Sequence, residues 1–170
     1  MEALAQFILG EDHPEITLES SEDNYQAVLT LLKQANRSLD IYTRYFDGKL
    51  FDTQEIRQPI QELAKQHMGS QVRILVAEIE PLVKYGHRIV ELSRRLSSYM
   101  ELRTIHKDYK QFNESFFIID GRGIIHRKYA DRYEGTAYSN NPLLGKELTD
   151  YFNEVWVRST QPPDARRLYI

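Results

Sequence analysis

Two short segments of the sequence concentrate side chains that can bind a negatively charged ligand. TIHKDYK, residues 104–110, carries one histidine and two lysines, and HRK, residues 126–128, carries three further bases. Lysine and arginine form strong, charge-assisted hydrogen bonds to phosphate or carboxylate oxygens. With an arginine from a third segment, the anion-binding candidates are Arg44, His106, Lys107, Lys110, His126, Arg127 and Lys128.

A plainer interpretation of each segment stays open. Short charged runs usually face solvent, so the alternative for Arg127 and Lys128 is a strand end at the surface. For Arg44 the alternative is an ion pair with Asp47, and for His106 it is an ordinary surface position. The pocket interpretation requires the segments to converge where parallel strands end, because ligands bind at the carboxyl ends of such strands.

Other catalytic chemistries have little support in the sequence. The chain has no cysteine, which excludes disulfides and thiolate metal sites, and it has no H-x-x-x-H or H-E-x-x-H spacing. No nucleotide-binding glycine loop is present, and we expect no metal and no cofactor. The net charge of −3 argues against strong non-specific binding of nucleic acid, although residues 103–128 are locally basic.

Length and composition indicate one globular domain. The 170 residues include no apolar run near the ~18 residues that a membrane span needs. The short apolar run at the start lacks a basic segment before it, so it is a poor signal peptide, and we expect a cytoplasmic protein. We expect an acidic N-terminal segment at 1–23, a domain at 24–160 and a tail at 161–170.

The hydrophobic pattern predicts the elements that position these segments. Expected helices lie near 24–36, 53–68 and 86–98, and expected strands lie at 38–46, 71–79 and 100–105. Their alternation predicts parallel strands with helices packed against them. An Asp-Gly pair between apolar runs then predicts a hairpin near 116–125, and a last helix is expected at 142–160.

The hairpin segment NESFFIIDG resembles part of the catalytic motif of the phospholipase D superfamily. That motif, H-x-K-x4-D, ends with an aspartate near a turn, and Asp120 takes this position. NYQAVLTLLKQANRSLDIYTRYF resembles the opening helix and first strand of one half of this superfamily, QVRILVAEI its second strand, and TDYFNEVW its closing helix. The resemblance covers residues 24–158. It implies an α/β fold, a phospholipase D-like half-domain, whose mixed, mostly parallel sheet is flanked by helices.

The same alignment places other residues at the two catalytic positions. Asn113 stands at the histidine position and Ser115 at the lysine position, and no G-S-x-N element is recognisable near HRK. The superfamily's reaction needs an imidazole that attacks phosphorus and a lysine that neutralises the phosphoryl oxygens. A carboxamide is a very poor nucleophile, and serine carries no charge. The resemblance therefore implies a degenerate, non-catalytic half-domain.

The resemblance also implies a partner. The superfamily builds its site from two facing motifs and this chain has length for one, so we expect a homodimer. The 11 tyrosines, several of them beside basic segments, favour a half-buried interface over base stacking. The expected ligand bears phosphate, with nucleic acid as the less favoured form. Two alternatives stay open: a phosphodiesterase or nuclease that uses His106 or His126, and an accessory protein-interaction module.

Overall fold

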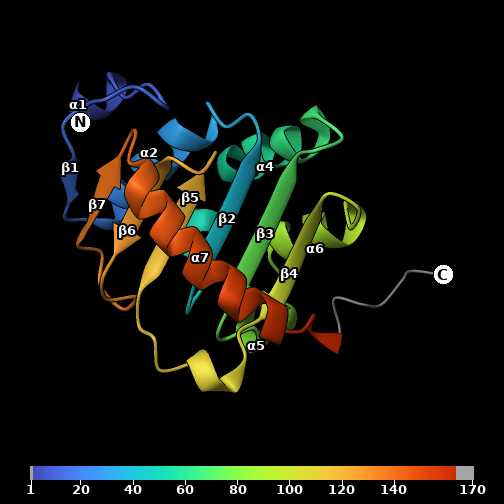
Figure 1. Ribbon diagram of the computed structural model, residues 1–170. Coiled ribbons are helices and arrows are strands. Elements are labelled where there is room, and N and C mark those ends of the chain that lie inside the picture. The colour runs from blue at the N-terminus through green and yellow to red at the C-terminus, as the bar shows by residue number, and fades with distance from the viewer. Residues whose placement is uncertain (1, 164–170) are drawn as a thin grey trace.

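The computed structural model describes residues 2–163, apart from the side chain of Lys49, and these residues form one mixed sheet with helices on both faces (Figure 1). The seven strands of this described part lie in the order β1-β7-β6-β5-β2-β3-β4. Their bounds are β1 Ile16–Leu18, β2 Ser38–Thr43, β3 Gln71–Val76, β4 Met100–Thr104, β5 Ser115–Ile119, β6 Gly123–Arg127 and β7 Gly135–Tyr138. Most of the expected tail at 161–170 lies outside the described residues.

Parallel pairing in the described sheet is limited to β2 with β3 and β3 with β4. The other four neighbouring pairs are antiparallel, so the expected mixed sheet is confirmed but contains less parallel pairing than expected. The hairpin explains the difference. Its first strand, β5, joins β2 in the opposite direction, and β6, β7 and β1 extend that antiparallel side.

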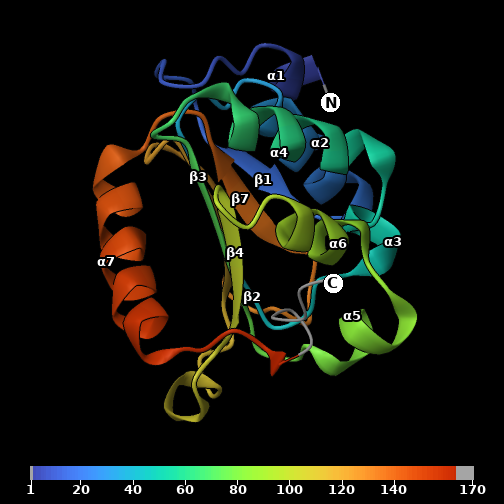
Figure 2. The ribbon, with the colours of Figure 1, turned by 90° about the vertical axis from the view of Figure 1, so that its right-hand side faces the viewer.

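Helices cover both faces of the sheet, with α7 alone on one side and α2, α4 and α6 on the other (Figure 2). The longer helices are α2 Ser21–Leu32, α4 Gln54–Gln66, α6 Arg88–Arg95 and α7 Pro142–Arg158, and the shorter ones are α1 Glu2–Ala5, α3 Gly48–Phe51, α5 Glu80–Tyr85 and the 3-10 helix η1 Lys107–Tyr109. Leu148, Phe152 and Val155 of α7 are buried, as the helical spacing predicts. Within the described residues, no helix is both long and apolar enough to span a bilayer.

Local sequence signals fix the starts of three helices. α2 follows Ser20, whose side chain accepts a hydrogen bond from the Asp23 N–H, while the Asp23 carboxylate accepts one from the Ser20 N–H. Thr53 caps α4, as its place before the apolar stripe predicts. Asn141 caps α7, and Pro142 takes its first position, where no N–H is needed.

The turn between β5 and β6 fastens the hairpin to the rest of the fold. Asp120 lies in the left-handed region with φ of 53°, and Gly121 follows with φ of 74°. The Asp120 carboxylate accepts hydrogen bonds of 2.7–3.2 Å from the backbone N–H groups of residues 36–38, just before and at the start of β2. α7 packs on the same turn, because a Cβ at Gly145 would lie 2.1 Å from the Gly121 carbonyl oxygen.

Part of the acidic N-terminal segment belongs to the sheet. β1 pairs antiparallel with β7, and Leu4, Phe7 and Leu18 are buried in the core. The sequence does not predict either strand, because both are short and their partner lies more than a hundred residues away along the chain. Their pairing extends the sheet beyond the hairpin.

Candidate functional site

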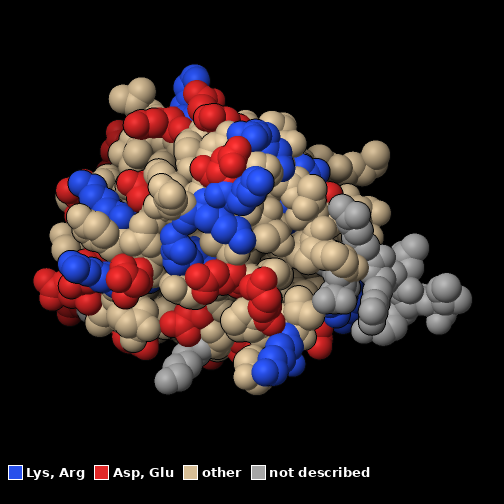
Figure 3. All heavy atoms as spheres, turned by 90° about the horizontal axis from the view of Figure 1, so that it is seen from below, with Lys and Arg blue, Asp and Glu red and all other residues tan. Residues whose placement is uncertain are grey.

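One end of the sheet gathers most of the candidate residues. The carboxyl ends of β2, β3 and β4 meet the start of β5 and the end of β6 there. Arg44 follows β2, His106 follows β4, Asn113 precedes β5, and His126 lies near the end of β6. Viewed from this end, the molecule carries a band of Lys and Arg side chains across its middle, with Asp and Glu beside it (Figure 3). We call this surface the strand-end face.

Arg44 is held by three acceptors on the strand-end face. Its Nε donates to Asn113 Oδ1 at 3.2 Å, its Nη2 donates to the Lys110 carbonyl, and its Nη1 lies 3.7 Å from Glu78 Oε1. The structure thus pairs Arg44 with a carboxylate, and that carboxylate belongs to Glu78 rather than to the expected Asp47. The guanidinium charge is compensated, and the contacts tie the end of β2 to the segment that enters β5.

The three positions aligned with the superfamily motif are separated along the hairpin. Asn113 uses its amide oxygen on Arg44. Ser115 is 3 % exposed and stands directly opposite Arg127 in the β5–β6 register, so both side chains point to one face of the sheet. Asp120 lies at the other end of β5, where it binds backbone N–H groups. Asn113 and Asp120 thus make contacts within the fold, and Ser115 is buried.

His126 forms a close pair with a carboxylate on the strand-end face. Its Nε2 lies 3.1 Å from Glu114 Oε2, and the two side chains are 14 % and 30 % exposed. Sequence reasoning named His126 but missed Glu114 as its partner. The Glu114 carboxylate on one nitrogen of the His126 imidazole fixes the orientation of the ring and leaves the other nitrogen for chemistry.

Tyr42 and Tyr151 pack together on the α7 side of the sheet, and burial raises the pKa of both phenols.

His106 belongs to a different local network, beside the end of α7. Its Nδ1 accepts the N–H of Asp108 at 3.1 Å, which caps η1, and its backbone N–H donates to Ser159 Oγ. Arg158 binds the Asp108 carboxylate at 2.8 Å. The candidate lysines all have exposed side chains, namely Lys107, Lys110 and Lys128. Across the described part of the chain, no group of three or more His, Asp or Glu side chains is placed to hold a metal ion.

Arg127 is buried, so the plainer interpretation of a solvated strand end is wrong for this residue. It is 9 % exposed, its Nη1 donates to the Arg132 carbonyl at 3.0 Å, and its guanidinium lies 6.0 Å from the centre of the Tyr133 ring. Tyr133 in turn donates its hydroxyl proton to Asp47 Oδ2 at 3.1 Å. Burial lowers the pKa of the Arg127 guanidinium. Lys128, the next residue, is exposed.

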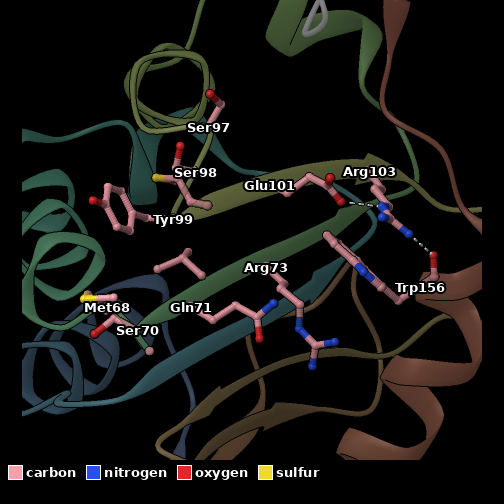
Figure 4. Close-up of a pocket in the computed structure, with 13 residues that line it drawn as sticks. Met68, Ser70, Gln71, Arg73, Ser97, Ser98, Tyr99, Glu101, Arg103 and Trp156 are labelled. Carbon is pink, nitrogen blue, oxygen red and sulfur yellow. Dashed lines mark hydrogen bonds and ion pairs between the residues drawn. The ribbon is translucent and has the colours of Figure 1, made fainter.

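A separate hollow of about 470 Å³ lies between β3, β4 and the C-terminal half of α7 (Figure 4). Arg73 and Arg103 line it, with guanidinium groups 5.6 and 4.2 Å from the Trp156 ring centre. Each cation has a carboxylate partner, since Arg73 binds Asp40 at 2.8 Å and Arg103 binds Glu101. Sequence reasoning missed these pairs. Asp40 and Arg73 are the third residues of two adjacent parallel strands, which is the signal that could have revealed their contact.

Solved structures share this architecture. Nuc from Salmonella typhimurium, a phospholipase D family member, aligns with a TM-score of 0.60 at 15% identity over 88% of this chain and 97% of Nuc. NucT from Helicobacter pylori aligns with a TM-score of 0.57 at 14% identity over 88% of this chain and 99% of NucT. Identities this low establish the fold alone, so the fold is phospholipase D-like.

A further structural relative is TrmBL2, an archaeal chromatin protein whose structure shows a novel mode of DNA binding. It aligns with a TM-score of 0.65 at 13% identity over 92% of this chain, and this chain spans 55% of TrmBL2. No curated protein matches the sequence. A family model described as a domain of unknown function (DUF7931) matches residues 20–168, nearly the whole chain. The protein therefore belongs to the DUF7931 family and has a phospholipase D-like fold.

Proposed function

We propose that this chain is a non-catalytic module of phospholipase D-like fold that forms a homodimer and binds a phosphate-bearing ligand on its strand-end face. The proposal rests on the contacts and burial of the two residues that stand at the catalytic positions of the motif, Asn113 and Ser115. Asn113 is bonded to Arg44 through its amide, and Ser115 is buried. Neither side chain offers the imidazole nucleophile or the cation that the superfamily's reaction requires.

Phosphate binding is supported by the cations at the strand ends. Figure 3 shows a band of basic side chains there, and the candidate lysines are exposed. Phosphate oxygens accept strong hydrogen bonds from such groups. Glu78 and Glu114 lie on the same face and reduce its positive potential, so we expect modest affinity. TrmBL2 makes nucleic acid one candidate source of the phosphate, and the net charge of −3 speaks against strong binding of this kind.

Dimer formation is supported by exposed aromatic side chains that follow β2 and β6. Tyr45, Tyr129 and Tyr133 are 44, 56 and 38 % exposed. Tyrosine is enriched in protein interfaces, because it contributes a large apolar ring and a hydroxyl that tolerates water. Two copies that meet through their strand-end faces would place a band of cations on each side of one ligand.

Light scattering and a phosphate titration test this proposal together. We expect a mass near twice the 20.0 kDa of one chain, and inorganic phosphate at about 10 mM should shift the backbone amide resonances of the strand-end face. Tyr129→Asp should reduce the mass to that of a monomer, whereas Met68→Asp, a fully exposed position at the opposite end of the sheet, should not. A monomer without phosphate shifts contradicts the proposal. A dimer without them supports the accessory interaction module instead.

The pair between His126 and Glu114 favours a second candidate, a phosphodiesterase or nuclease with a relocated histidine. The 3.1 Å contact orients an imidazole on the face where the superfamily's site lies. If His126 acts as the nucleophile, a phosphodiester substrate should leave an acid-labile phosphoryl group on it, which mass spectrometry of quenched protein would detect. An unmodified His126 after incubation excludes this mechanism.

A further inference from the structure

Arg127 is a nearly buried cation whose position is fixed by its strand and by the loop that follows. Its backbone pairs with Ser115, so its side chain leaves β6 on the same face as that small residue. Its stem packs against Gly135, where an added Cβ would lie 2.8 Å from Arg127 Cγ. Its Nη1 is anchored on the Arg132 carbonyl at 3.0 Å. The guanidinium is therefore held in place before any ligand arrives.

The charge of Arg127 is not compensated by a close carboxylate. Within the described residues it forms no ion pair, and its Nε and Nη2 have no acceptor, although neither is sealed from solvent. Burial lowers the pKa of the guanidinium, and Tyr133, Asp47 and Asp131 counter this only in part. A buried charge without a partner is costly, which favours any anion that supplies one.

Three of the other partly buried arginines differ in this respect. Arg44 pairs with Glu78, Arg73 with Asp40, and Arg103 with Glu101. Their guanidinium groups are occupied by carboxylates of the chain itself. Arg127 instead keeps two donor groups available at the strand-end face, next to a position where the side chain is only a serine.

We propose that Arg127 is the cation that binds the phosphate group, through Nε and Nη2. This inference rests on the proposed function and names the contact responsible for it. The planar guanidinium offers two donors to two oxygens of one phosphate. Asp47, which Tyr133 holds nearby, opposes anion binding by its charge.

Calorimetric titration with inorganic phosphate, dimethyl phosphate and acetate tests the assignment. We expect wild type to bind both phosphates and not acetate, and Arg127→Met to weaken phosphate binding at least tenfold. Asp47→Asn keeps Arg127 and should tighten binding several-fold, which keeps the test decisive if Arg127→Met does not fold. Arg95→Met removes one exposed charge from α6 and should leave the affinity unchanged.

The outcomes separate the inference from the proposed function. Wild-type binding that neither Arg127→Met nor Asp47→Asn changes overturns the role of Arg127 and leaves the proposed function standing. Absence of phosphate binding by wild type overturns both. Equal binding of acetate overturns the assignment to phosphate. A preference between inorganic and dimethyl phosphate, in either direction, supports the site and identifies the ligand as a free phosphate or monoester, or as a diester.

Discussion

Asn113 and Ser115, the residues aligned with the two catalytic positions of the superfamily motif, both have structural surroundings of their own. Asn113 now belongs to the contacts that hold Arg44, and Ser115 is a small buried residue opposite Arg127. Placing the superfamily's residues back at these positions would disturb existing contacts before it created a reaction site. On the proposed function, both the packing around the hairpin and its sequence would oppose catalysis.

Ser115→Lys should destabilise the protein. The new ammonium would enter a buried position that faces the Arg127 guanidinium, and an uncompensated buried charge costs about 3 kcal/mol or more. Ser115→Ala is the matched control and should stay within about 1 kcal/mol of wild type. Urea unfolding measures both. A Ser115→Lys variant as stable as wild type would show that the space beside Arg127 is open to a second cation.

His87 should make the protein less stable in mild acid. It is buried, its Nδ1 accepts the Ile89 N–H at 3.1 Å at the start of α6, and burial lowers its pKa. In the unfolded chain the imidazole takes up a proton below about pH 6.5, whereas the folded one stays neutral to a lower pH. Protonation therefore favours the unfolded state as the pH falls through that window.

His87→Asn isolates this effect, because the amide oxygen can cap α6 without titrating. Between about pH 7.5 and pH 5.5, wild type should lose up to about 1 kcal/mol more unfolding free energy than the variant. Parallel pH profiles for the two proteins would show that His87 is protonated equally easily in the folded and unfolded states.

At the scale of elements, the contact between α7 and the β5–β6 turn leaves no room for a side chain. A Cβ at Gly145 would lie 2.1 Å from the Gly121 carbonyl oxygen, and backbone cannot move aside cheaply. Gly145→Ala should lower the unfolding free energy by at least about 2 kcal/mol. Gly69→Ala, with no atom within 4 Å of its Cβ and no positive φ, is the control and should be nearly neutral. Equal stability of the two variants would contradict this packing.

Elements with strong local signals could be predicted from the sequence. β2, β3, β4 and the β5–β6 hairpin carry β-branched or apolar runs, and α4 and α7 carry apolar stripes with caps. β1 and β7 could not be predicted, because three or four residues give no pattern and their pairing joins distant parts of the chain. The same missing long-range information explains why the expected sheet was more parallel than the observed one.

For a similar reason, the sequence names the residues of the candidate site but not their partners. Motif spacing located Asn113, Ser115 and Asp120, and charge identified the basic segments. The contact partners of these residues could be identified only from the folded structure. Contacts such as Arg44 with Glu78, or His126 with Glu114, depend on which strand ends lie side by side, and the burial of Arg127 depends on the loop that covers it.

At the level of the whole molecule, the fold has the phospholipase D-like arrangement, and part of its positive charge is paired with carboxylates of the chain itself. The net charge is −3, and the basic band of Figure 3 is bordered by acids that pair with part of it. On the proposed function, we expect this surface to bind a single phosphate group rather than a long polyanion, because the positive potential is local. Dimerisation would bring two such local positive regions together, while each chain would keep its net charge of −3.

Hydrolysis of bis-p-nitrophenyl phosphate is the measurement we would make to test whether the protein lacks catalytic activity. The assay compares wild type with His126→Ala and His106→Ala, each checked for folding and for oligomeric mass on the same sample. We expect p-nitrophenol to be released at the uncatalysed rate for all three proteins, because neither Asn113 nor Ser115 provides the imidazole that would attack phosphorus. Hydrolysis by wild type that disappears in either histidine variant would contradict the account and identify that histidine as the nucleophile.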